Sequence, residues 1–143
     1  MSRDESEKTE KILVDTDILV WYFRGHEGAE AFLAAIARPA RQVSSLTVME
    51  LIQGCRNKKE IKEIGVFLAA NIPLVVHPDR AASEMAIRLL SRYALFQGLR
   101  TVDALLAATA ITSEVSLATG NWRHFQSLPG LKIRRFDPSV GFS

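Results

Sequence analysis

Two acidic residues separated by one position, Asp15 and Asp17, follow an apolar run in the stretch LVDTDILV at residues 13–20. Two further acids, Glu50 and Asp103, lie in equally apolar stretches, VMELIQG and TVDALLAATA. Carboxylates that meet in a partly desolvated cleft repel one another, and at least one takes up a proton unless a cation compensates the charge. The pattern therefore indicates a site that binds a cation.

The expected cation is Mg²⁺, with Mn²⁺ as a substitute, because ligands made only of oxygen select hard ions. The three histidines stand singly, and no Cys–His pair has the spacing of a zinc site. A cation held by a few carboxylates keeps several waters, activates one as a nucleophile and stabilises the charge that develops on a phosphate. This combination indicates hydrolysis of a phosphodiester or a phosphomonoester.

Each acid also has a purely structural interpretation. Thr47 and Glu50 match a capping box, in which the glutamate only satisfies a backbone amide at a helix start. Asp103 in the first turn of a helix is favoured by the helix dipole, with Thr101 as a cap. One of the acids in residues 15–17 can cap the helix that follows the first strand. Capping alone does not explain why every acid is embedded in apolar sequence, so the joint pattern favours a site.

The elements that must position these acids alternate between strand-like and helix-like segments, which is typical of an α/β sandwich around a largely parallel sheet. The strand candidates are residues 11–16, 41–45, 72–77, 115–119 and 131–136. The helix candidates are residues 18–23, 27–37, a segment from near Thr47 to Gly54, 58–70, a long helix opened by Pro78 and Asp79, and 101–113.

This architecture predicts that the acids meet. Ligands collect at the carboxyl ends of parallel strands, where loops enter the next helices. Asp15 ends the first strand, and Glu50 and Asp103 fall in first turns of helices that we expect on the same edge. Asp17 is near enough to support the groups that bind the cation directly, without binding it itself.

The composition sets broad limits. With 143 residues, the chain is expected to form one domain at residues 11–143, preceded by a charged, disordered leader at residues 1–10. No apolar run approaches a membrane span. A single cysteine, Cys55, fits the reducing cytoplasm. The net charge of +2 permits binding to nucleic acid but does not establish it.

Four blocks of the sequence resemble, in order and spacing, the signature blocks of PIN-domain proteins, in particular VapC-type toxins: ILVDTDILVWYFRG, SSLTVMELIQG, TVDALLAATA and LATGNWRHF. The resemblance covers nearly all of residues 11–136. It implies a three-layer α/β/α sandwich and a metal-dependent endoribonuclease that cuts single-stranded regions of RNA. It also implies a cytoplasmic homodimer, the toxin of a type II toxin–antitoxin pair, held inactive by an antitoxin that inserts a C-terminal segment into the acidic pocket.

The resemblance assigns the acidic pocket to Asp15, Glu50 and Asp103, as metal ligands and catalytic groups. Many members of the family add a fourth acid near the last block. Here the neutral Asn121 stands there, with an amide that can orient a water, and His124 is expected to be structural. We therefore expect one well-held ion rather than two.

Other polar residues are candidates for contacts with the substrate. Thr16 and Thr119 are expected to position a phosphate or a ligand carboxylate. The candidates for the RNA backbone are Arg24, Arg56, Lys58, Lys59 and Arg123, each of which can equally be part of a solvated surface. Trp122 either stacks on a base or packs against the domain.

Two other functions compete with this interpretation. LVDTDILV partly imitates the D-x-D signature of haloacid-dehalogenase phosphatases, in which Asp15 would be the nucleophile and Asp17 the general acid. Leu19 stands where that family usually has a small residue, and no later paired-acid motif is present. The incomplete fourth acid also suggests a catalytically silent module that only binds RNA or a protein.

Overall fold

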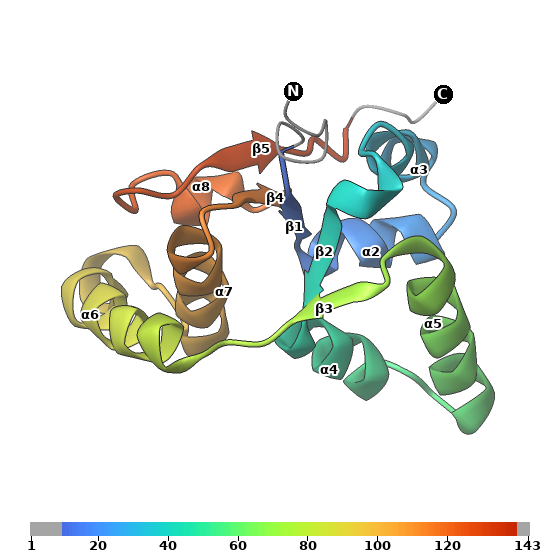
Figure 1. Ribbon diagram of the computed structural model, residues 1–143, viewed down its shortest axis with the longest axis horizontal. Coiled ribbons are helices and arrows are strands. Elements are labelled where there is room, and N and C mark those ends of the chain that lie inside the picture. The colour runs from blue at the N-terminus through green and yellow to red at the C-terminus, as the bar shows by residue number, and fades with distance from the viewer. Residues whose placement is uncertain (1–9, 140–143) are drawn as a thin grey trace, which may run out of the picture.

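A five-stranded parallel sheet forms the centre of the computed structural model, which describes residues 10–139 (Figure 1). The strand order is β3-β2-β1-β4-β5, and every neighbouring pair is parallel. The strands are β1 (Ile12–Val14), β2 (Arg41–Ser44), β3 (Leu74–Val76), β4 (Ser116–Thr119) and β5 (Ile133–Arg135). The predicted parallel sheet is confirmed, whereas the predicted leader falls almost wholly outside the described residues.

Helices cover both faces of the sheet and complete the predicted three layers. Figure 1 shows α6 and α7 on one side and α2, α3 and α5 on the other. The helices of the described chain are α2 (Thr16–Phe23), α3 (Glu27–Ala34), the short 3₁₀ helix η1 (Arg38–Ala40), α4 (Ser45–Gln53), α5 (Lys58–Asn71), α6 (Arg80–Gln97), α7 (Thr101–Thr112) and α8 (Trp122–Phe125). No helix within residues 10–139 is long and apolar enough to cross a membrane.

The central strands are apolar on both faces because helices bury both. Leu13 and Leu117 belong to the core beneath α6 and α7, whereas Ile12, Val14 and Ala118 belong to the core beneath α2, α3 and α5. This alternation follows from the two-residue repeat of a strand. A strand buried on both sides therefore reads as a continuous apolar run.

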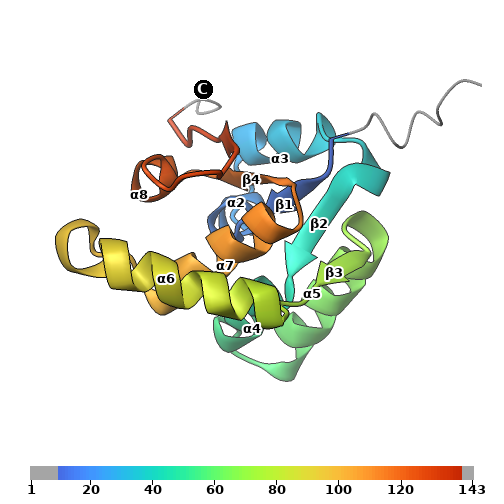
Figure 2. The same cartoon turned by 60° about the vertical axis from the view of Figure 1, so that its left-hand side comes forward.

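The helix pair α6–α7 shows how local sequence fixes the layer on one face. Asp79 caps α6, because its Oδ1 accepts a hydrogen bond of 2.9 Å from the amide of Ala82. Gly98 ends the helix at a φ of 68°, a conformation that favours glycine. Figure 2 shows α7 between α6 and the sheet. This position explains why α7 is apolar nearly all round.

The strand order creates a switch point at β1. The chain passes from β1 to β2 and β3 on one side, and later returns to β4 and β5 on the other. The connections after β1 and β4 therefore leave the sheet in opposite directions. In open α/β sheets, ligands bind in the crevice at such a point, outside the carboxyl ends of the strands. Asp15 and Thr119 lie at these two strand ends.

Candidate functional site

Asp15 follows β1 directly and is held by hydrogen bonds on both carboxylate oxygens. Its Oδ1 accepts from the amide of Thr16 over 2.7 Å, and its Oδ2 accepts from the hydroxyl of Thr119 over 2.8 Å. Only 9% of Asp15 is exposed. Asp15 also caps α2, as the structural interpretation predicted, so capping and a role in a site are combined in one residue.

Asp17 lies in the first turn of α2 beside Asp15. Its Oδ2 accepts a hydrogen bond of 2.8 Å from the amide of Gly120, whereas its buried Oδ1 has no hydrogen-bond partner among the described residues. A Cβ on Gly120 would lie 2.4 Å from that Oδ2, so only glycine permits this contact. The importance of Gly120 was missed from sequence, although its place between β4 and the NWRHF segment was a usable signal.

The two aspartates destabilise each other's charge. Burial, followed by the charge of Asp17, raises the pKa of Asp15 from 3.8 to about 7, with a smaller contribution from Asp103. The hydrogen bonds from Thr119 and Thr16 oppose this shift. Burial also raises the pKa of Asp17, against the hydrogen bond from Gly120. A positive charge beside these carboxylates would favour their ionised forms and lower both pKa values.

Glu50 reaches the same edge from α4. The hydroxyl of Thr16 hydrogen-bonds to Glu50 Oε1 over 2.6 Å and to the hydroxyl of Thr47 over 3.0 Å. The helix begins at Ser45 rather than near Thr47, and Ser44 caps it through the amide of Leu46. The capping box predicted for Thr47 and Glu50 is therefore wrong, and the exposed Glu50 carboxylate points toward Thr16.

Asp103 reaches the same edge from the first turn of α7. It is half-buried and close enough to Asp15 to raise the pKa of that group. The cap predicted at Thr101 is wrong, because α7 starts at Thr101 and its N-cap residue, Arg100, makes no side-chain cap. Capping therefore does not account for Asp103. The helix dipole still favours an acid in the first turn of α7.

The donors at this edge suit a metal ion that keeps water among its ligands. Within residues 10–139, no three Asp, Glu, His or Cys side chains converge closely enough to enclose an ion as a complete group. The nearby donors are nevertheless all oxygen, and Asp17 Oδ1 is a buried acceptor without a donor among the described residues. Magnesium is commonly held by one or two carboxylates while water and substrate phosphates fill its other positions. The residues fit a hydrated magnesium ion of this kind.

The other predicted site residues lie around this edge in different settings. Thr119 is fully buried, so its hydroxyl serves to hold Asp15 and also accepts from the amide of Asn121 over 3.0 Å. Asn121 itself is exposed at the start of α8. Arg24 ends α2, with its guanidinium carbon 5.6 Å from the centre of the Trp21 ring. Arg123 is exposed on α8.

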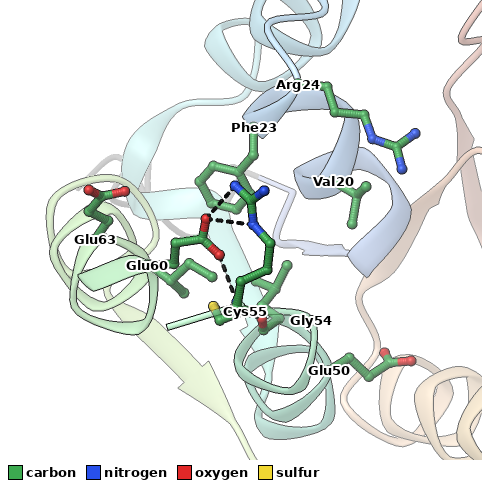
Figure 3. Close-up of a pocket in the computed structure, with 11 residues that line it drawn as sticks. Val20, Phe23, Arg24, Glu50, Gly54, Cys55, Glu60 and Glu63 are labelled. Atoms are coloured by element: carbon green, nitrogen blue, oxygen red, sulfur yellow. Dashed lines mark hydrogen bonds and ion pairs between the residues drawn. The ribbon is translucent and has the colours of Figure 1, made fainter. Parts of the chain in front are cut away.

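A cavity of about 680 Å³ lies between α2, α4 and α5 and reaches the acid cluster through Glu50. Figure 3 shows Glu50 and Arg24 on one side of it, and Glu60 and Glu63 on the opposite side. Arg56 closes part of the wall through an ion pair of 2.8 Å with Glu60. Val20, Phe23, Leu51 and Ile64 give the cavity apolar surface. It thus combines acidic groups with apolar walls.

Comparison with known proteins identifies relatives of this fold and sequence. The family model described as PIN domain matches residues 12–131. Ribonuclease VapC19 of Mycobacterium tuberculosis is 35% identical over 123 residues, which cover 84% of this chain and 96% of the relative. A toxin–antitoxin complex from Klebsiella pneumoniae contains a chain with 26% identity and a TM-score of 0.72, covering 85% of this chain and 95% of that one. FitAcB from Neisseria gonorrhoeae has the same fold, with 23% identity, a TM-score of 0.71, and coverage of 90% and 99%.

Proposed function

This chain belongs to the PIN domain family, among its VapC-type toxin ribonucleases, and we propose that it is a metal-dependent endoribonuclease that cuts single-stranded regions of RNA. The observation that carries the proposal is the pair of neighbouring carboxylates of Asp15 and Asp17 at the switch point of the sheet, both with a pKa that burial raises. Asp103 and Glu50 approach the pair from two other elements.

We assign the metal to Mg²⁺, with Mn²⁺ as a substitute, held by Asp15 and Asp103 with Glu50 at the outer side. Asp17 supplies a further oxygen, because its Oδ1 is buried and has no hydrogen-bond partner among the described residues. When bound, the ion would supply Lewis-acid stabilisation of the charge that develops on the phosphate. One ion suffices, since Asn121 brings no charge to the place where many relatives carry an acid.

The chain's own residues have three tasks in this proposal. Glu50 is exposed and takes the proton of the attacking water, while Thr16 holds its carboxylate in place over 2.6 Å. Thr119 fixes the position of Asp15 by donating a hydrogen bond to its Oδ2. Asn121, exposed at the start of α8, orients the water or a phosphate oxygen through its amide.

Positive side chains on either side of the acids are proposed to bind the RNA backbone. Arg24 lines the large cavity on the α2 side, and Arg123 lies on α8 on the other side. Phosphates pair well with the planar guanidinium group, which donates two parallel hydrogen bonds. The proposed path of the strand therefore passes over the acid cluster between these two arginines.

The large cavity is proposed to receive the antitoxin. Most of its apolar lining comes from two apolar segments, VWYF at residues 20–23 and IGVFLAA at residues 64–70, and Leu51 adds to it. Its acids, Glu60 and Glu63, favour a partner segment that carries a basic residue beside apolar ones. Since the cavity reaches Glu50, a segment seated there would block the proposed catalytic edge.

A homodimer in the cytoplasm completes the proposal. Exposed apolar side chains on α6 are suited to a second copy: Ile87 is 63%, Phe96 71% and Leu95 100% exposed. Large exposed apolar groups that cluster on one helix are typical of an interaction surface. Sedimentation of the wild type and of a Leu95→Glu variant measures whether this helix supports the dimer.

The activity is tested by incubating a defined RNA with the purified protein and Mg²⁺ or Mn²⁺. We expect cleavage by the wild type and a loss of about 10²-fold or more in Asp15→Asn and Asp103→Asn, since general or metal-assisted catalysis contributes that much. Glu30→Gln is the matched control, because Glu30 is an exposed acid on α3, away from the site. RNA that binds but stays intact under every metal would instead support the silent binding module.

A covalent phospho-aspartate would identify the phosphatase alternative. The sequence disfavours it, since Leu19 stands where that family usually has a small residue and no later paired-acid motif is present. Cleavage of RNA without an adduct on Asp15 is the expected result.

A further inference from the structure

A pair of arginines shares one aromatic ring beside the acid cluster. The guanidinium carbon of Arg135 lies 4.1 Å from the centre of the Trp122 ring, and that of Arg123 lies 4.9 Å from the same centre. A guanidinium held against an indole keeps its hydrogen-bond donors free for a ligand while its position is fixed. Two cationic groups are thus held together by one side chain.

Arg135 and Trp122 are both placed relative to Thr119, the residue whose hydroxyl hydrogen-bonds to Asp15. Arg135 is the register partner of Thr119 between β5 and β4, and the amide of Phe136 donates to the Thr119 carbonyl over 3.0 Å. Trp122 opens α8, three positions after Thr119 in the chain. The paired arginines are therefore fixed relative to the proposed catalytic edge, rather than carried on a separate loop.

A second cavity, of about 440 Å³, is lined by Trp122 and Arg123. Asn121 and Gly120, whose amide binds Asp17, also line it. It is separate from the larger cavity that we propose for the antitoxin.

The charges at this place favour an anion. Within residues 10–139, neither Arg123 nor Arg135 makes an ion pair with a carboxylate. One acid lines the cavity, Asp137, but its Oδ1 accepts from both the amide and the hydroxyl of Ser139, and its pKa is lowered by these bonds and by Arg123. The two guanidinium groups therefore exceed the one local carboxylate and keep donors available.

We propose that Trp122 holds Arg123 and Arg135 as a pair that binds one backbone phosphate of the RNA strand, next to the phosphate that is cut. This inference rests on the proposed function and adds to it the place where the strand leaves the catalytic edge. Arg135 becomes a binding residue for the substrate, and Trp122 becomes a positioning residue. The base beside that phosphate is not selected, because the donors are directed at the backbone.

The test compares two double variants that lose the same charge. Arg123→Gln/Arg135→Gln removes the pair, and Arg88→Gln/Arg92→Gln removes two exposed arginines of α6. Binding of a fluorescent single-stranded RNA is measured by anisotropy in EDTA, where no cleavage is expected. We expect the first variant to bind about tenfold more weakly, as loss of charge-assisted hydrogen bonds implies, and its salt slope to fall by about 0.7 for the lost phosphate. The α6 variant should bind nearly as the wild type does.

The role of Trp122 has its own readout. Trp122→Ala leaves both charges in place and should weaken RNA binding by about threefold or more through lost cation–π contacts, whereas Trp122→Phe should retain most of the affinity. With Mg²⁺, the arginine variant should raise KM for a long RNA and leave kcat nearly unchanged. Equal loss of affinity in both double variants, or full affinity in Trp122→Ala, would overturn the proposal. Absence of cleavage by the wild type overturns the nuclease function instead, because the binding measurements do not depend on it.

Discussion

The hydroxyl of Thr119 donates to Oδ2 of Asp15 over 2.8 Å, joining residues that are 104 positions apart in the chain. This hydrogen bond links the ends of β4 and β1 at the switch point of the sheet. It also opposes the effect of burial on the pKa of Asp15. The proposed catalytic carboxylate is therefore positioned by a residue that never contacts the solvent.

Thr119→Val tests this link, because valine keeps the shape of threonine and removes the hydroxyl. We expect the free energy of unfolding to fall by about 1–3 kcal/mol, the cost of leaving a buried acceptor unpaired, and RNA cleavage to fall with it. Thr119→Ser should restore most of both. The measurements are urea denaturation and initial cleavage rates. A Thr119→Val protein with full activity would show that Asp15 is positioned by other contacts.

Gly120→Ala should damage the acid cluster through a single methyl group. The new Cβ would lie 2.4 Å from Oδ2 of Asp17, which forces the carboxylate away from the Gly120 amide. We expect a loss of about 1–3 kcal/mol in unfolding free energy, as is typical of overpacking, and a large fall in cleavage. Gly65→Ala in α5 is the matched control, because nothing lies within 4 Å of its Cβ. That change should leave activity intact and stabilise the helix by up to about 1 kcal/mol.

The raised pKa of Asp15 predicts how stability depends on pH without metal. Its value is about 7 in the folded chain and 3.8 ordinarily, so the folded state binds the proton more tightly. The stabilisation from this group is complete below pH 3.8 and is lost as the pH rises through 7. Removing the charge should therefore help the metal-free protein at high pH.

Asp15→Asn measures this effect, because asparagine keeps the shape and retains an oxygen that accepts a hydrogen bond. In EDTA at pH 8, we expect the variant to be more stable than the wild type by about 1–3 kcal/mol. At pH 5, the advantage should shrink. Adding Mg²⁺ should stabilise the wild type and not the variant. If the wild type gains nothing from Mg²⁺ or Mn²⁺, the metal assignment is wrong.

If the antitoxin binds in the larger cavity, a substitution there should change inhibition by the antitoxin without changing RNA cleavage. Phe23→Asp places a charge on the apolar wall of the larger cavity, away from the acid cluster. We expect RNA cleavage to stay near the wild-type rate, while inhibition by the cognate antitoxin weakens by about tenfold or more, as for a charge introduced into an apolar contact. Titration of cleavage with antitoxin measures both. An unchanged inhibition curve would place the partner elsewhere.

Much of the fold was predictable because both faces of the sheet are buried. The continuous apolar runs of β1 and β4 and the apolar helix α7 were predicted from sequence and are confirmed. The start of α4 was misplaced, because Ser44 and Thr47 are both good caps and only the tertiary position of Thr16 engages Thr47 elsewhere. Local pattern does not distinguish two such candidates.

The site was less predictable than the fold. The sequence predicted that Asp15, Glu50 and Asp103 form one pocket; Glu50 contacts Thr16 beside Asp15 and Asp103 contributes to the pKa of Asp15, but no three such acids of residues 10–139 converge into one metal-binding group. The close partnership of Asp17 with Gly120 depends on a contact between residues 103 positions apart. The Arg135–Trp122 contact likewise depends on the pairing of β5 with β4. Spacing along the chain does not show which residue such a side chain will contact.

The hydrogen bond between Thr119 and Asp15 also has a consequence for the order of synthesis. A chain that emerges from the ribosome carries Asp15 and Asp17 long before it carries Thr119 and Gly120, which hold their carboxylates. Until most of the polypeptide has been translated, these carboxylates have no scaffold. The proposed catalytic edge is therefore complete only late in the synthesis of the chain.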